Sequence, residues 1–118
     1  MNLILIITPE FARAVKSLLK KYRLILNDLK TLEQELSTGE AKAVELGRNC
    51  YKTRLQNSSI PVGKSGGFRI IYFYKKDDKI YLLEIYAKTD MEDIRDTRLL
   101  EILKNNDLAK GLAALSSG

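Results

Sequence analysis

Basic side chains in the middle of the chain are the residues most capable of chemistry. Residues 48–88 contain nine Lys or Arg and three acids, whereas eleven basic and twelve acidic residues lie elsewhere, so the net charge of +5 comes from this segment. Concentrated positive charge attracts polyanions such as nucleic acid, although a solvated basic surface gives the same count. The nine are Arg48, Lys52, Arg54, Lys64, Arg69, Lys75, Lys76, Lys79 and Lys88.

Four of these cations are predicted to converge. Residues 48–56 alternate as a strand, so Lys52 and Arg54 project from the same face roughly 7 Å apart, comparable to the spacing of phosphates along RNA. Arg69 interrupts an apolar strand, where a charged side chain is costly unless it faces a wet cleft. Lys88 follows the last predicted strand. If these strands are neighbours, the four side chains meet on one side of a sheet.

A lysine in a turn and several tyrosines are further candidates for binding. Gly63-Lys64-Ser65 is similar to the end of a nucleotide-binding P-loop, but Ser58 replaces the required glycine and a strand follows, so we expect a turn whose lysine reaches a phosphate. Tyrosines in strands either stack on bases or pack in a core. They are Tyr72, Tyr74, Tyr81 and Tyr86.

Several classes of protein are disfavoured by what the chain lacks. It has no histidine and a single cysteine, Cys50, so an internal disulfide is impossible and neither a zinc site nor any other cofactor is expected. No apolar run approaches the ~20 residues of a membrane span. Residues 1–7 lack a basic start and are followed by Thr8-Pro9-Glu10, which predicts a strand rather than a signal peptide. We expect a cytoplasmic protein.

The elements that position these side chains are predicted from periodicity. A buried strand over 3–7 precedes two helices, the first capped by Thr8 and the second ending at Gly39. Strands follow at 48–56, 68–75 and 80–87, the last two as an antiparallel hairpin. Thr89-Asp90-Met91-Glu92 fits a capping box that opens a further helix, and a last short helix is expected at 108–115.

These elements predict one domain over residues 1–118. We expect an α+β fold with a small, mostly antiparallel β-sheet of about four strands. An N-terminal helical hairpin covers one face and a C-terminal helix follows the sheet.

Two blocks of sequence resemble the RelE/HigB toxins of bacterial type II toxin–antitoxin systems, and the HigB-like branch in particular. They are Gly63-Lys64-Ser65-Gly66-Gly67-Phe68-Arg69-Ile70-Ile71-Tyr72 and Tyr81-Leu82-Leu83-Glu84-Ile85-Tyr86-Ala87-Lys88. The order of predicted elements before and after these blocks fits as well. The resemblance implies a RelE-like fold.

The resemblance also implies a ribosome-dependent mRNA endoribonuclease, restrained by a co-encoded antitoxin. This antitoxin is expected to be of the helix-turn-helix, HigA-like type, and the toxin is expected to reach operator DNA only through it. The ribose 2′-hydroxyl would attack the adjacent phosphodiester without a metal. Arg69 would stabilise the scissile phosphate, Lys52 and Arg54 would orient the RNA or include the base, and Lys88 would lie at the rim or assist the leaving group. Other RNA-binding candidates are Lys64, Arg48, Tyr74 and Tyr86.

Departures from the family leave alternatives to the nuclease interpretation open. RelE itself has an arginine after its equivalent of Lys88 and a tyrosine about two turns further, where this chain has Thr89 and Arg95. The general acid is therefore not assigned by the resemblance. The alternative is a catalytically inactive RelE-fold module that binds RNA or an antitoxin through the same basic sheet. A regulator that binds operator DNA with its antitoxin is a third, weaker possibility, since no helix-turn-helix pattern is visible.

Overall fold

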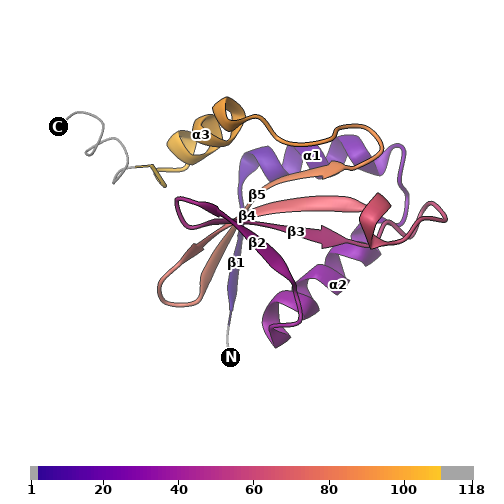
Figure 1. Ribbon diagram of the computed structural model, residues 1–118, viewed down its shortest axis with the longest axis horizontal. Helices are drawn as coiled ribbons and strands as arrows, with labels where there is room; N and C mark the ends of the chain where they lie inside the picture. The colour runs from indigo at the N-terminus through magenta and orange to yellow at the C-terminus, as the bar shows by residue number, and fades with distance from the viewer. Residues whose placement is uncertain (1–2, 110–118) are drawn as a thin grey trace.

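The protein folds as an α+β domain around one five-stranded sheet, and the computed structural model describes residues 3–109 (Figure 1). The strand order is β1-β5-β4-β3-β2. β1 pairs with β5 in parallel, and every other pair is antiparallel. The strands are β1 (Ile4–Ile7), β2 (Ala43–Gly47), β3 (Cys50–Leu55), β4 (Phe68–Lys75) and β5 (Lys79–Ala87).

The predicted helical hairpin is confirmed as two separate helices, α1 (Pro9–Leu19) and α2 (Ile25–Thr38). Thr8 caps α1 by accepting a hydrogen bond from the backbone N–H of Phe11. Its hydroxyl also donates to the carbonyl oxygen of Leu82 at 2.7 Å, which ties the start of the helix to β5. Gly39 ends α2 in the left-handed conformation, with φ of 77°.

The sheet separates two apolar cores. On one face, α1 and α2 bury Phe11, Ile25 and Leu32 against alternate residues of β4 and β5. On the other, α3 (Asp96–Asn105) packs Leu99, Ile102 and Leu103 against the sheet. The predicted strands at 68–75 and 80–87 are confirmed, and they form the centre of the sheet because both of their faces are covered.

A β-bulge in β5 decides which side chains face the second core. The pairing of β4 with β5 moves from Ile71↔Glu84 to Tyr72↔Leu82, so Leu83 is an extra residue. Leu83 and Tyr86 consequently both lie in the core beneath α3, whereas Leu82 and Ile85 lie in the core beneath α1 and α2. Bulges redirect side chains in this way. This one turns Tyr86 towards the face that carries the basic residues.

The predicted α+β fold with a mostly antiparallel sheet is confirmed, but two details of its strands were incomplete or wrong. The sheet has five strands rather than about four, because β2 was missed. The 3–7 strand is confirmed, but it is an edge strand rather than a buried one, with Ile4 and Ile7 half exposed or more. No helix among residues 3–109 is long and apolar enough to span a membrane.

The capping box predicted at residues 89–92 was wrong. The third helix begins at Asp96, with Arg95 as an N-cap that makes no side-chain capping bond. The Thr89 hydroxyl instead lies 3.2 Å from the hydroxyl of Tyr22, and Asp90 pairs with Lys21 at 2.8 Å. Residues 88–95 therefore form a loop held against the junction between α1 and α2. Most of the short helix predicted at 108–115 lies outside the described residues.

Candidate active site

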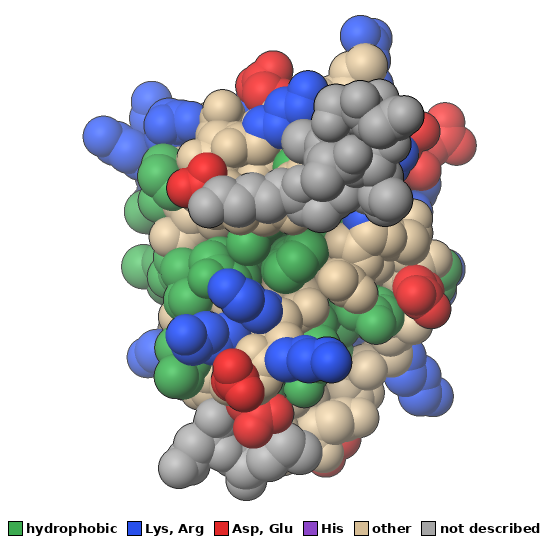
Figure 2. All heavy atoms as spheres, turned by 90° about the vertical axis from the view of Figure 1, so that its left-hand side faces the viewer, with side chains coloured by type: hydrophobic (Ala, Val, Ile, Leu, Met, Phe, Trp, Pro, Cys, Tyr) green, Lys and Arg blue, Asp and Glu red, His purple; other side chains and the backbone are tan. Residues whose placement is uncertain are grey.

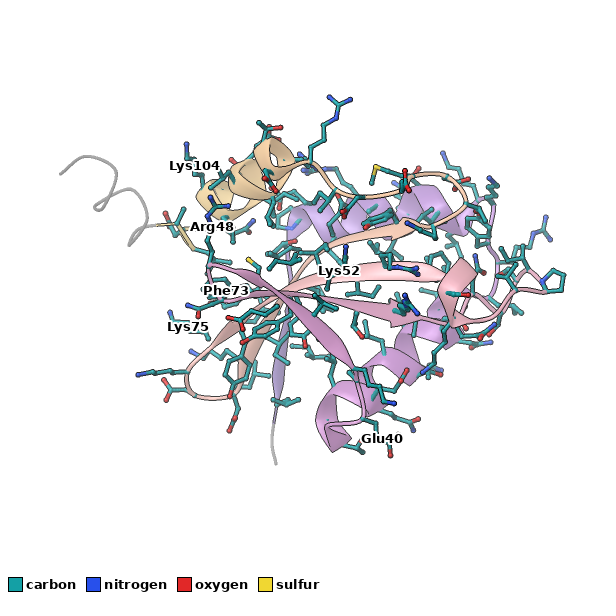
Figure 3. All side chains as sticks on the ribbon, viewed as in Figure 1. Glu40, Arg48, Lys52, Phe73, Lys75 and Lys104 are labelled. Atoms are coloured by element: carbon teal, nitrogen blue, oxygen red, sulfur yellow. The ribbon has the colours of Figure 1, made fainter. Side chains whose placement is uncertain are left out.

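A groove of about 630 Å³ lies beside β3, the strand that carries Lys52 and Arg54, near the edge of the sheet formed by β2. Its floor comes from β3 and β4, one wall from β2 and the end of α2, and its far end from the turn at 64–66. Lys52 stands over the middle of the sheet, and Glu40 lies just beyond the C-terminal end of α2 (Figure 3). Five of the predicted cations line this groove: Lys52, Arg54, Lys64, Arg69 and Lys88.

Arg69 is the buried member of this set, with only 7% of the residue exposed. Its Nη1 donates to the carbonyl oxygens of Lys64 (3.2 Å) and Phe68 (3.4 Å), and its Nη2 donates to that of Ser65 (2.8 Å). A guanidinium has five N–H donors, so two remain without a partner among the described residues. Arg69 thus braces the 64–66 turn and also lines the groove.

Arg54 lies directly opposite Arg69 on the neighbouring strand. In an antiparallel pair, directly opposite residues have Cα atoms about 4.5–5.5 Å apart, so two like charges are held close together. Burial, followed by the charge of Arg54, lowers the pKa of Arg69 below its ordinary value. Arg54 is exposed and makes no hydrogen bond or ion pair within residues 3–109. The pair is a concentrated positive site, and neither arginine has an ion-pair partner in the described part of the chain.

The three lysines of the groove, in contrast, are each engaged by the protein. Lys52 pairs with Asp93 at 3.3 Å, and Lys64 pairs with Glu35 at 2.9 Å. Lys88 donates to the backbone carbonyl oxygen of Glu92 at 2.8 Å. An anion that enters the groove therefore meets Arg54 and Arg69 first and competes with carboxylates for Lys52 and Lys64.

Asp93 links the groove to Tyr86. Its Oδ1 accepts hydrogen bonds from Lys52 Nζ, from Tyr86 Oη at 3.2 Å and from its neighbour's backbone N–H at 2.9 Å. Burial opposes ionisation of Asp93, but these hydrogen bonds outweigh it and hold its pKa below the ordinary value. Burial, reinforced by the negative charge of Asp93, raises the pKa of Tyr86 to about 12. Tyr86 is therefore a protonated phenol at neutral pH.

The comparisons with known proteins agree with this architecture. The chain matches the family described as the RelE toxin of the RelE/RelB toxin–antitoxin system over residues 8–117. The chain belongs to the RelE toxin family. It is accordingly a toxin of a toxin–antitoxin system, and its partner is an antitoxin. No curated protein matched.

Two predicted RNA-binding residues of this RelE-family toxin lie away from the groove. Arg48 is in the turn between β2 and β3, with φ of 56°, at the opposite end of β3 from Arg54. Figure 3 places it near Lys104 and Lys75, and Figure 2 shows the basic and apolar side chains of that end. Tyr74 is 40% exposed and lines a separate pocket beside the end of α2.

The other tyrosines of the toxin's strands are mostly packing residues. Tyr72 is buried and stacks on Tyr51, with ring centroids 5.5 Å apart. Tyr81 meets Phe73 edge to face. Tyr86 is only 5% exposed, so its hydroxyl rather than its ring is directed to the polar surface. Stacking of a base on these rings would need them to move.

Sequence reasoning missed the acidic side of the site. Glu35 and Glu40 line the groove with Lys42 and Val44, and Asp93 holds Lys52. One signal was available for Glu35, because it lies three positions after the buried Leu32 on α2 and therefore on the same side of the helix. Asp93 carried no signal, since it lies in a loop that was predicted as helix. Within residues 3–109, no three His, Cys, Asp or Glu side chains are grouped to hold a metal ion.

Proposed function

We propose that this toxin is a ribosome-dependent mRNA endoribonuclease of the HigB-like branch, and that it acts in the cytoplasm. The observation that carries the proposal is the groove, in which Arg54 and Arg69 lie opposite each other and three lysines surround them. A groove of that charge suits the backbone of an extended RNA strand. The two blocks of sequence that resemble HigB supply Arg69, Lys64 and Lys88 to it.

The chemistry we propose is internal transfer at one phosphodiester. The ribose 2′-oxygen loses its proton and bonds to phosphorus, while the bond from phosphorus to the 5′-oxygen of the next nucleotide breaks and that oxygen takes up a proton. The products are a 2′,3′-cyclic phosphate and a 5′-hydroxyl. Negative charge grows on the phosphoryl oxygens during this step, and fixed cations stabilise it. The protein's own cations carry the reaction, and no metal or other cofactor is invoked.

Arg69 is the residue we propose for stabilising the phosphorane. Its bonds to the carbonyl oxygens of Lys64 and Ser65 fix the guanidinium in place before substrate arrives. The two free N–H donors match two phosphoryl oxygens, as in other arginine–phosphate pairs. Preorganised donors of this kind contribute about 10²–10³-fold in rate. Arg54 and Lys52 then orient the RNA, while Lys88 lies at the rim near the leaving group.

Expression of the toxin without its antitoxin tests the proposal. We expect growth arrest, and mapping of mRNA 5′ ends after brief induction should show cuts within codons. Arg54→Gln should relieve the arrest, because Arg54 contacts the groove without supporting the fold. Lys76→Gln, which removes an equal charge from the exposed turn between β4 and β5, should not. Normal growth with abundant soluble wild-type protein would contradict the proposal.

A second function, binding of RNA or of the antitoxin without cleavage, is favoured by one observation. Each lysine of the groove is already engaged by Asp93, Glu35 or the carbonyl oxygen of Glu92. If the toxin is catalytically inactive in this way, it would bind RNA without cleaving it, and the 5′ ends of the RNA would be unchanged. We expect the antitoxin, which we propose to be HigA-like with a helix-turn-helix, to bring the pair to operator DNA. Its own binding surface would then be acidic, to suit a toxin of net charge +5.

A further inference from the structure

We infer that Asp93 is a positioning residue, which fixes the ammonium group of Lys52 and the hydroxyl of Tyr86 at the groove and limits how tightly the groove binds RNA. The inference rests on the proposed function for the reaction that Lys52 serves. The expected effects of Asp93 on the pKa of Tyr86 and on the affinity for RNA do not depend on that reaction.

The contacts of Asp93 are its first support. One carboxylate oxygen accepts from Lys52 Nζ at 3.3 Å, Tyr86 Oη at 3.2 Å and the backbone N–H of Ile94 at 2.9 Å. Lys52 projects from β3 and Tyr86 from β5, with β4 between these strands. A single oxygen therefore joins side chains from the two strands that flank Arg69. Because this oxygen accepts three hydrogen bonds, the carboxylate has little freedom to move. The side chains of Lys52 and Tyr86 are therefore held in place.

The loop that carries Asp93 is anchored at two points that precede Asp93 in the chain. Asp90 pairs with Lys21 and accepts from the hydroxyl of Tyr22 at 3.1 Å. Two residues further on, the carbonyl oxygen of Glu92 accepts from Lys88 Nζ. These contacts hold residues 88–95 in a non-helical path against the sheet. The position of Asp93 depends on this loop, because a helix that began at residue 89 would not present Asp93 in this conformation.

The electrostatics of the site give Asp93 a second effect. Lys52 has only 24% of its side chain exposed, and Asp93 is its carboxylate partner. A phosphate must compete with that carboxylate for the same ammonium group. Arg69, which is opposite Tyr86 on β4, adds a positive charge on the other side. Asp93 thus lowers the positive potential that RNA meets while it keeps Lys52 in one orientation.

These two effects predict a split between affinity and rate. Asp93→Asn keeps the shape but removes the charge, so Lys52 is free to bind phosphate. Binding of a short single-stranded RNA should tighten about two- to fivefold, and its dependence on log salt should steepen by about 0.7. Cleavage of ribosome-bound mRNA in a single turnover should slow by about 10- to 100-fold, because Lys52 is no longer oriented.

Matched variants separate this role from mere support of the fold. Asp77→Asn removes the same charge from the exposed turn between β4 and β5 and should change neither affinity nor rate. Asp93→Glu restores the charge and should recover part of the rate. In a Lys52→Gln background, Asp93→Asn should give no gain in affinity, since the double-mutant cycle removes the partner.

The pKa of Tyr86, followed by NMR of ring-labelled tyrosine, reports on the contact without any activity. Loss of the Asp93 charge should lower this pKa from about 12, while Asp77→Asn should leave it unchanged. Asp93→Asn that keeps the pKa of Tyr86, or that weakens RNA binding, would overturn the inference. So would a wild-type cleavage rate in that variant. If the wild-type toxin cleaves no RNA, the proposed function fails, and the affinity and titration results still decide the role of Asp93.

Discussion

Substitution of Arg54 by glutamine should weaken RNA cleavage and yet stabilise the protein. Arg54 is exposed, makes no bond to the rest of residues 3–109, and lies directly opposite the buried Arg69. Like charges directly opposite each other on neighbouring strands destabilise a sheet by about 0.2–1 kcal/mol. Burial is the main cause of the lowered pKa of Arg69, and the charge of Arg54 is the next, which reflects the same repulsion.

The free energy of unfolding of Arg54→Gln should therefore rise by up to about 1 kcal/mol. For a domain of this size, that corresponds to an increase in Tm of about 4 °C. The gain should shrink as salt is raised from about 0.01 M to 1 M, because the Debye length falls from about 30 Å to 3 Å. Urea or thermal unfolding at both salt concentrations measures it.

Arg23→Gln is the control, because Arg23 is also exposed but lies between α1 and α2 rather than on a strand. It should change the stability by less than about 0.5 kcal/mol at either salt concentration. A loss of more than 1 kcal/mol in Arg54→Gln, or a gain that salt does not alter, would refute the reasoning that two arginines repel each other across β3 and β4.

Three further predictions test the fold. Gly67→Ala should destabilise the toxin by more than about 2 kcal/mol in urea unfolding, because the new Cβ would lie 2.2 Å from the carbonyl oxygen of Leu55; a wild-type midpoint would contradict that close approach. Burial raises the pKa of the Cys50 thiol to about 11, so alkylation at pH 8 should be about 100-fold slower in native than in unfolded protein. The hydrogen bond from Lys21 lowers the pKa of Asp90, so this contribution to stability is present above the unfolded pKa and is lost as pH falls through the folded one; the stability difference between wild type and Asp90→Asn should close over that range, and a constant difference would count against the pair.

Periodicity in the sequence was sufficient for the parts of the fold that bury one face or two. The strands at 68–75 and 80–87 and the two N-terminal helices followed from apolar spacing, because burial imposes that spacing. β2 was missed because none of its residues is buried, so burial imposes no spacing on them. All five of its residues, Ala43–Gly47, are exposed, and the alternation of Val44 and Leu46 around Glu45 is too short to predict a strand. An edge strand is held by backbone hydrogen bonds, which any sequence can make.

The groove was predicted only in part. Alternation along β3 and the position of Arg69 within an apolar run were enough to place Lys52, Arg54 and Arg69 on one face. The carboxylates that pair with the lysines come from α2 and from the loop after β5, and local patterns carry no information about such tertiary partners. Thr89 illustrates the difficulty, since its capping motif is valid locally but its hydroxyl contacts Tyr22 instead.

In the mechanism proposed here, cations from separate strands bind one phosphodiester while the neighbouring ribose 2′-hydroxyl attacks its phosphorus. Purified toxin, added to ribosomes programmed with an mRNA that carries a single 2′-deoxynucleotide at the cleavage position, tests this most directly. We predict that cleavage at that position is abolished and that the all-ribose mRNA yields a 2′,3′-cyclic phosphate by mass spectrometry. Equal cleavage of the two mRNAs, or a product with a 5′-phosphate, would contradict the account.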